Sequence, residues 1–229
     1  MEHYQQSFNK LFAKFTSSIA GIILTLLLFT TAVEAQCPSC SGITLGCPGG
    51  ATCYSWNSVQ LVVSITGGCD VTVCYCWREV HNFPFSGDVT FQSVITRIDS
   101  VAGCNNNITT ADFVAQISAA VKADLIPLIS TGNVPPCTGP VITWHSQMFL
   151  PACFKRIQIS TSPNRWAFIP CHLNSYCVMS FDLCRGNNGA IETSNVTYTT
   201  QGTVDCDDAP TKVGDWLTDG TCYHPPCGM

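Results

Sequence analysis

The stretch VTVCYCWR at residues 71–78 decides how this chain folds. Valine, tyrosine and tryptophan occupy its odd positions, while threonine, cysteine and arginine occupy its even positions. Successive side chains of a strand point to opposite faces, so this alternation predicts a strand with one apolar face. Cys74 and Cys76 then point away from Tyr75 and Trp77. We predict that each bonds to a neighbouring strand or a covering loop, and not to the other.

Similar patterns predict more strands on both sides of this stretch. Apolar side chains occupy every odd position from 59 to 65, and Gly67-Gly68 ends that strand. In residues 88–99 the apolar positions change phase, which predicts a β-bulge near Ser93. Five further strands are predicted at residues 141–149, 153–160, 165–169, 176–184 and 191–200.

One amphipathic helix is predicted at about residues 110–126. Thr109 is suited to cap it, and Asp112 follows three residues later as in a capping box. Apolar residues recur at helical spacing up to Leu125, and Pro127 is expected to end the helix. We therefore predict a mainly β, disulfide-rich domain, an antiparallel sheet or sandwich with this helix packed on it.

Cysteine usage indicates an oxidising compartment, because disulfides persist outside the cytosol. The chain of 229 residues has 16 cysteines, all after residue 35. The spacing leaves their pairing open. Many stand in a loop-rich N-terminal arm (36–58) and an irregular C-terminal tail (202–229). The cysteines expected in disulfides are Cys37, Cys40, Cys47, Cys53, Cys69, Cys74, Cys76, Cys104, Cys137, Cys153, Cys171, Cys177, Cys184, Cys206, Cys222 and Cys227.

The N-terminus is typical of a secretory signal. Lys10 and Lys14 precede an apolar run, and the small residues Val33 and Ala35 fit a cleavage site. An uncleaved anchor is the alternative, but a spanning helix needs about 20 apolar residues. We predict a signal peptide at 1–35, a single domain at 36–229, no membrane span after cleavage, and a secreted, extracellular or cell-surface location.

The composition excludes some classes of protein. Charged residues make up 11% of the chain against about 25% in typical proteins, and the formal net charge is −5. The basic surface of a nucleic-acid binder is therefore missing, and no nucleic-acid partner is expected. A surface with so few charges is poorly protected against self-association.

No motif in the chain supports catalysis or metal binding. The pair Cys37 and Cys40 has redox or zinc spacing, but it stands at the start of the predicted mature chain without a strand before it. There is no G-x-S-x-G, and neither His145 nor Glu79 lies in a catalytic motif. We predict no catalytic residues, no cofactor and no metal site.

Three weaker features remain. An acidic cluster that includes Asp205, Asp207 and Asp208 is either a solvated loop or a calcium site. Asn107 and Asn195 begin glycosylation sequons. A planar platform for sugar binding would need loop tryptophans, of which the candidates are Trp56, Trp166 and Trp216.

The segment from Cys74 to Arg78, followed by Cys104, resembles uncharacterised secreted cysteine-rich bacterial proteins over residues 69–104. The resemblance assigns no functional residue. It implies an exported bacterial protein, in which both sequons would be incidental.

These observations favour a non-enzymatic structural protein that assembles into an extracellular filament or a cell-surface layer. Its expected partners are copies of itself. The alternatives are an adhesive or carbohydrate-binding module with a glycan or surface ligand, and a secreted hydrolase that uses His145 and Glu79. An uncharged sheet edge around Thr193, Thr197 and Thr199 is the feature expected to promote assembly.

Overall fold

The computed structural model describes most of the chain after the predicted signal peptide. The described residues are 37–82, 89–100, 107–129, 134–138, 144–161, 164–172 and 174–227. The predicted signal peptide and Cys104 lie outside these ranges, as do residues 141–143 of one predicted strand.

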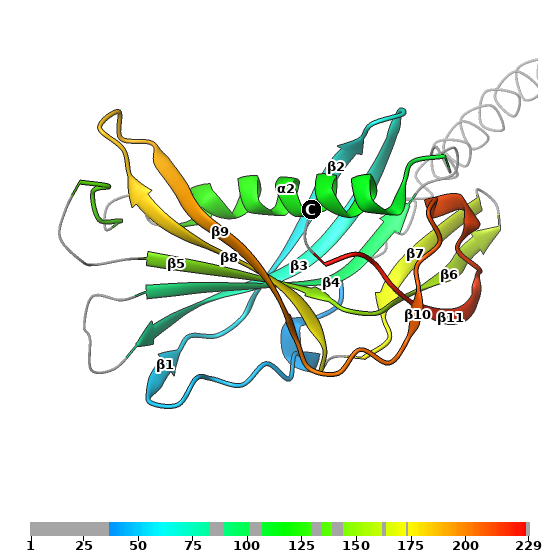
Figure 1. The fold of residues 1–229 in the computed structure, drawn as a ribbon, viewed down its shortest axis with the longest axis horizontal. Helices are drawn as coiled ribbons and strands as arrows, with labels where there is room; N and C mark the ends of the chain where they lie inside the picture. Colours follow the sequence, from blue (N-terminus) through cyan, green and yellow to red (C-terminus); the bar gives the residue numbers. More distant parts are fainter. Residues whose placement is uncertain are drawn as a thin grey trace, which may run out of the picture. The chain divides into compact units, whose positions relative to one another are not determined.

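These residues form one mixed β-sheet and one α-helix (Figure 1), which confirms the predicted mainly β fold with a helix packed on a sheet. The helix α2 spans Thr110–Leu128, and the 3-10 helices η1 and η2 span Cys40–Gly42 and Val213–Asp215. The strands are β1 (Ala51–Cys53), β2 (Asn57–Ile65), β3 (Cys69–Asn82), β4 (Val89–Ser100), β5 (Trp144–Pro151), β6 (Phe154–Thr161), β7 (Asn164–Pro170), β8 (Tyr176–Arg185), β9 (Ile191–Gln201), β10 (Asp207–Asp208) and β11 (Asp219–His224).

The sheet divides at β4. One side of β4 pairs with β3 along its length, while the other side pairs with β5 through residues 90–94 and with β7 through residues 98–100. The main path therefore runs β2-β3-β4-β5-β8-β9, and a second branch runs β7-β6-β11-β10. Among the described strands, β4 pairs with β5 and β10 with β11 in parallel, and all other pairings are antiparallel. The sheet is thus mixed where an antiparallel one was predicted.

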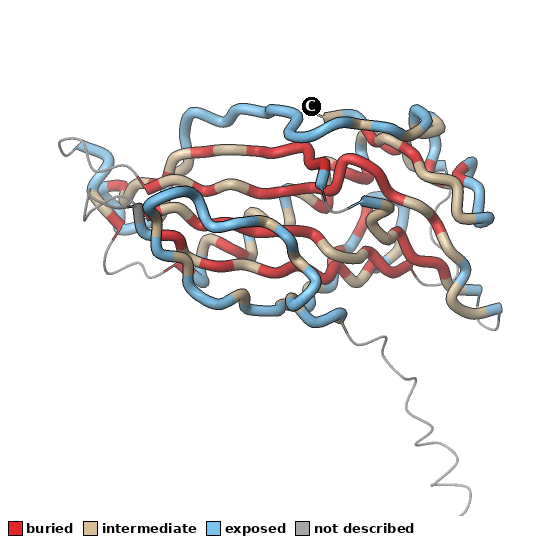
Figure 2. The backbone as a smooth tube through the Cα atoms, turned by 90° about the horizontal axis from the view of Figure 1, so that it is seen from below, coloured by how far each residue is buried: buried red, intermediate tan, exposed pale blue. Residues whose placement is uncertain are grey.

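Helix α2 covers one face of the sheet, which we call the helix face (Figure 1). Its apolar stripe of Phe113, Ile117, Val121 and Leu125 is buried against strand residues such as Tyr75, and these residues belong to one large apolar cluster. Figure 2 shows how buried backbone runs through the middle of the strands while the connections are exposed. The alternation in residues 71–78 therefore predicted correctly that the side chains at the odd positions point into this core.

The start of α2 follows the prediction, and its end does not. Thr109 is the N-cap, and its side-chain oxygen accepts a hydrogen bond from the main-chain N–H of Asp112 at 3.1 Å. The helix continues through Pro127 to Leu128. A proline in the last turn removes one main-chain donor, and here the helix closes beyond it, because the N–H of Ile129 donates to Leu125 and Ile126.

The bulge in β4 lies at Thr96, and the predicted position near Ser93 is wrong. The register between β3 and β4 shifts between Cys74 and Tyr75, where Thr96 is the extra residue, and its hydroxyl donates to the carbonyl of Cys74 at 3.1 Å. The sequence pattern was misleading because Val94 is apolar but lies on the face opposite α2, in a second apolar cluster. A strand buried on both faces does not show a clean period of two.

The two chain ends are more regular than predicted. The tail contains β10, β11 and η2, and β11 pairs with β6 within the second branch. The arm contains η1 and β1, which pairs with the end of β3. The prediction of an irregular tail is therefore wrong for residues 219–224, which pair with the distant strand β6, and for residues 207–208, which pair with β11 within the tail.

Seven disulfides join described cysteines, and Cys69 is also disulfide-bonded. Cys74 and Cys76 bond to Cys37 and Cys40, so the prediction that they are not each other's partners is confirmed. The remaining pairs are Cys47–Cys53, Cys137–Cys184, Cys153–Cys206, Cys171–Cys222 and Cys177–Cys227.

Candidate functional site

The N-terminal arm covers the face of the sheet opposite α2, which we call the arm face (Figure 1). Two disulfides to Cys74 and Cys76 attach it to β3. The apolar contacts are few. Ile43, Leu45 and Trp56 of the arm pack against a small cluster in β4, β5 and β8 that consists of Val94, Phe149, Tyr176 and Val178.

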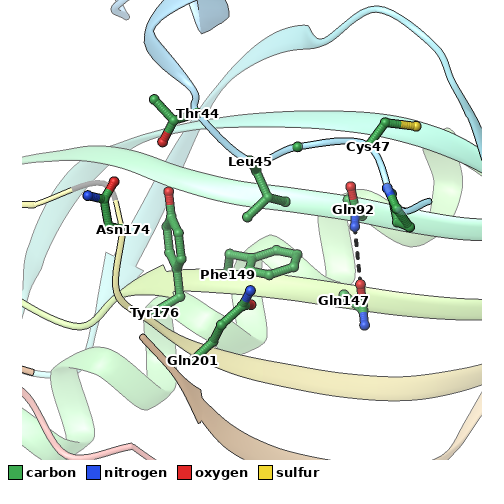
Figure 3. Close-up of a pocket in the computed structure, with 11 residues that line it drawn as sticks. Thr44, Leu45, Cys47, Gln92, Gln147, Phe149, Asn174, Tyr176 and Gln201 are labelled. Atoms are coloured by element: carbon green, nitrogen blue, oxygen red, sulfur yellow. Dashed lines mark hydrogen bonds between the residues drawn. The ribbon is translucent and has the colours of Figure 1, made fainter. Parts of the chain in front are cut away.

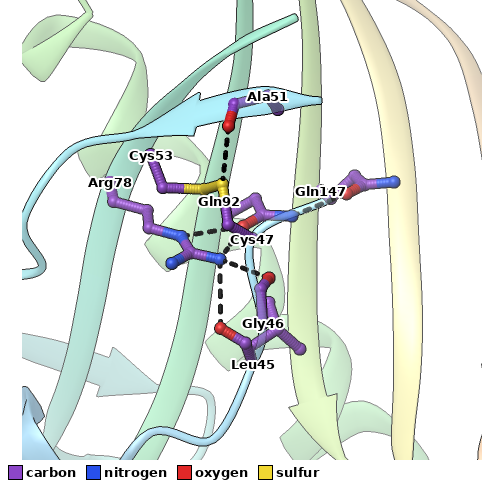
Figure 4. The surroundings of a disulfide bond; sticks show 8 residues. All are labelled: Leu45, Gly46, Cys47, Ala51, Cys53, Arg78, Gln92 and Gln147. Atoms are coloured by element: carbon purple, nitrogen blue, oxygen red, sulfur yellow. Dashed lines mark hydrogen bonds between the residues drawn. A yellow bond between two sulfur atoms is a disulfide. The ribbon is translucent and has the colours of Figure 1, made fainter. Parts of the chain in front are cut away.

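Arg78 of β3 fixes the middle of the arm. Its side chain is 5% exposed, and its Nη2 donates to the carbonyl oxygens of Leu45 at 3.1 Å and Gly46 at 2.8 Å (Figure 4). The guanidinium also lies 4.4 Å from the centre of the Trp56 ring. Burial lowers the pKa of Arg78 from its ordinary value. These polar and aromatic contacts hold the arm where apolar packing is thin.

The same guanidinium orients two glutamines. Its Nε and Nη2 donate to Oε1 of Gln92 at 2.9 and 2.7 Å. Nε2 of Gln92 in turn donates to Oε1 of Gln147 at 3.2 Å, across the β4–β5 pair (Figure 4). Arginine can only donate, so the direction of every bond in this chain is determined.

A cavity of about 440 Å³ lies between the arm and the sheet beside these glutamines (Figure 3). Tyr176, Phe149 and Leu45 supply the aromatic and apolar part of its wall. None of the described side chains that line it carries a charge. Its polar lining consists of Thr44, Gln92, Gln147, Asn174, Tyr176 and Gln201.

A second cavity, of about 310 Å³, lies on the helix face between α2 and the strands β5, β8 and β9. Its wall is mainly apolar and includes Met148 and Met179. Val196 and Tyr198 of β9 also line it, and they remain 43% and 42% exposed. Apolar surface is therefore accessible along this side of β9.

The main path has an open strand at each end. In the described part of the chain β2 pairs only with β3, and β9 pairs only with β8. β2 contains no charged residue, β9 contains only Glu192, and Val62 of β2 is 61% exposed. The edge predicted around the threonines of β9 exists, and β2 is a second uncharged edge that the sequence analysis did not single out.

A bulge in β9 brings three polar residues together. The register shifts between Ser180 and Asp182, and Asn195 adopts a φ of 52°. Nδ2 of Asn195 donates to Asp182 at 2.6 Å, and the second carboxylate oxygen of Asp182 lies 2.6 Å from Nδ1 of His145. No hydrogen bond joins His145 to a hydroxyl or thiol among the described residues.

The other candidates from the sequence lie apart. Glu79 lies 3.3 Å from His81, whereas the partner of His145 is Asp182. Trp166 and Trp216 are each 5% exposed in the apolar core, so the prediction of a planar tryptophan platform is wrong for them. The sequence suggested that both lie near loops. In the structure Trp166 is part of β7, and Trp216 lies in the part of the tail that packs against α2, so both are buried.

The described residues bring no metal-binding group together in a usable form. Three possible ligands, Cys137, Cys184 and Glu192, lie within 4.8 Å of one another, but the two cysteines form a disulfide. The acidic cluster at 205–208 joins no such group among the described residues. Asn107 is exposed in the turn before α2, two residues before the N-cap Thr109.

Comparisons with known proteins give no family for this chain: no family model, no curated protein and no solved structure matches it. The disulfides fit an extracellular protein. Within the described residues, no helix has the length and apolar character needed to cross a membrane.

Proposed function

We propose that the protein is a non-enzymatic extracellular structural protein whose copies assemble by adding the β9 edge of one copy to the β2 edge of the next. The observation that supports this proposal is the pair of open, nearly uncharged strands at the two ends of the main path. Unpaired main-chain groups at such edges accept a further strand.

The two edges favour a head-to-tail contact. β2 has 9 residues and β9 has 11, so each offers a similar length of main chain. The bulge at Asn195 divides β9 and leaves residues 197–201 as its longer regular segment. A contact between two different edges can be repeated from copy to copy, and where the rotation between copies does not close a ring, repetition produces a filament. Pairing of β2 with β2 would instead produce a closed dimer.

The test uses purified chain from residue 36 onward with its disulfides formed, studied by electron microscopy and sedimentation velocity. The expected result is filaments or concentration-dependent oligomers. A charged side chain on an edge strand opposes pairing. Val62→Lys and Thr199→Lys are therefore each expected to remain monomeric, whereas the control Thr211→Lys, at an exposed position outside both edges, assembles like the original chain.

A mixture of the two edge variants makes the test specific. Each Val62→Lys copy retains an intact β9, and each Thr199→Lys copy retains an intact β2. The mixture is expected to form heterodimers and nothing longer. Dimers of Thr199→Lys alone would show β2–β2 pairing, and a monodisperse monomer at high concentration for the original chain would contradict self-assembly.

A further inference from the structure

The chain of hydrogen bonds from Arg78 determines what the arm-face cavity presents to a ligand. Oε1 of Gln92 must face the guanidinium, so its Nε2 faces Gln147. Oε1 of Gln147 is then occupied as an acceptor. Figure 3 shows this oxygen directed at Gln92 and the amide nitrogen on the opposite side. Among the described residues no group accepts a hydrogen bond from Nε2 of Gln147, so its N–H groups are left for a ligand, on a residue that lines the cavity.

The cavity is preformed, because rigid parts of the protein make up its walls. Phe149 and Tyr176 pack edge to face at 5.5 Å and are 3% and 2% exposed, so they form a firm wall. The opposite wall is the arm, which two disulfides and Arg78 hold in place. The volume of about 440 Å³ lies in the usual range for small-molecule sites, about 300–1,000 Å³. A rigid site loses little conformational entropy on binding.

The lining selects the charge of the ligand. Amide groups both donate and accept, and Gln147, Asn174 and Gln201 supply them without any ionised side chain. A ligand anion or cation would leave water for a lining without a charged partner, which is costly, because the Arg78 guanidinium is bonded to Gln92, Leu45 and Gly46 and does not itself line the cavity. Hydroxyl groups of a sugar, which donate and accept equally, match such a lining.

We propose that this cavity is a binding site for a neutral saccharide, with Gln147 as the donor that recognises it and Gln92 as its positioning residue. The site is independent of the sheet edges proposed for assembly. It also differs from the tryptophan platform considered from the sequence, because the residues that carry it are strand glutamines and the arm.

The test is a titration with neutral monosaccharides and disaccharides, including glucose, galactose, mannose, N-acetylglucosamine and cellobiose, with sialic acid as the charged comparison. Binding is followed by calorimetry and by the side-chain amide resonances of Gln147. At least one neutral sugar is expected to bind and shift those resonances, and sialic acid is not. The proposal is overturned if no neutral sugar in the panel does so.

Two near-isosteric variants separate recognition from folding. Gln147→Glu still accepts from Gln92 but loses both free N–H groups, so affinity is expected to fall about tenfold or more. Gln158→Glu changes the charge equally at an exposed position of β6, outside the cavity and outside both edge strands, and is expected to bind like the original chain. Unchanged affinity in Gln147→Glu would overturn the role of Gln147.

Gln92→Glu tests the positioning chain. The carboxylate introduced at this position still accepts from Arg78, but its second oxygen now requires a donor, so the amide of Gln147 turns and presents its oxygen to the cavity. Sugar affinity is expected to fall as in Gln147→Glu, while the thermal midpoint stays equal or rises. Retained affinity together with unshifted Gln147 resonances would contradict the orientation argument.

Discussion

The helix face and the arm face of this sheet are held by different means. On the helix face, α2 contains no cysteine and is fixed by an apolar stripe that packs into one large cluster. On the arm face, a chain with little regular structure contacts a small cluster and is attached through Cys74, Cys76 and Arg78. Covalent and charged contacts replace apolar area where the covering segment makes few apolar contacts.

The difference follows from the cost of ordering a chain. Each ordered residue loses about 1–2 kcal/mol of conformational free energy. A helix recovers this through its main-chain hydrogen bonds and a continuous apolar side, whereas the arm has few of either. Disulfides limit the freedom of the unfolded chain instead, and this explains why two of the four cysteines of the arm bond to the sheet.

The largest expected effect is removal of the two covalent attachments. In the variant Cys37→Ser, Cys40→Ser, Cys74→Ala, Cys76→Ala, the free energy of unfolding should fall by about 4–8 kcal/mol, since each disulfide contributes about 2–4 kcal/mol. Urea unfolding measures the loss, and hydrogen exchange should show the arm open while α2 stays protected. Protection of the arm that survives would show that apolar contact alone holds it.

The bond between Cys47 and Cys53 is the matched comparison. It lies within the arm and spans 6 residues, against 37 for Cys37–Cys74. Closure of the shorter loop should stabilise by about 1.5 kcal/mol less. Replacing both of these cysteines by serine is expected to leave the arm attached to the sheet.

A smaller effect is expected from a cavity on the helix face. Ile117 is fully buried beneath α2, so Ile117→Ala should lower the free energy of unfolding by about 2–5 kcal/mol. Ala119→Ser, at an exposed position on the same helix, should change it by less than about 0.5 kcal/mol. The two faces are not independent if Ile117→Ala also opens the arm to hydrogen exchange.

The smallest effect concerns the polar contact beneath the helix. The hydroxyl of Tyr75 donates to Asp124 at 2.5 Å, and burial, followed by this carboxylate, raises the pKa of Tyr75 above its ordinary value. Tyr75→Phe should cost about 1–2 kcal/mol at neutral pH, measured by urea unfolding.

The raised pKa also predicts an alkaline dependence. Unfolded tyrosine ionises near pH 10 while folded Tyr75 keeps its proton, so the unfolded state binds fewer protons. The contribution is complete below pH 10, and above it stability falls by up to about 1.4 kcal/mol per pH unit. The fall should be shallower in Tyr75→Phe, and equal slopes would contradict the assignment.

The fold class could be predicted from the sequence because apolar residues alternate along β3 and recur at helical spacing along α2. The sequence did not predict the parallel pairing of β4 with β5, although a strand, a helix and a strand in succession is the usual signal for it. Two neighbouring parallel strands need a long crossover connection, and α2 lies in the connection between β4 and β5. The alternating strands nearby carry the opposite signal, because alternation is typical of antiparallel sheets.

The arm-face cavity could not be predicted from the sequence. Gln92 and Gln147 occupy polar positions of alternating strands, where the simplest expectation is a side chain in water. Only the pairing of their strands and the cover supplied by the arm bring them into contact. The disulfide partners of the cysteines could not be predicted either, since spacing in the sequence does not determine which strand a loop covers.

The order of three disulfides has a consequence for incomplete chains. Cys153, Cys171 and Cys177 bond to Cys206, Cys222 and Cys227, so all three partners lie near the end of the sequence. A chain that stops before residue 206 leaves three thiols without partners, and loss of the last few residues leaves Cys177 alone. Each truncation thus leaves at least one free thiol that a thiol-specific reagent would label, whereas a chain that extends to Cys227 can pair all three.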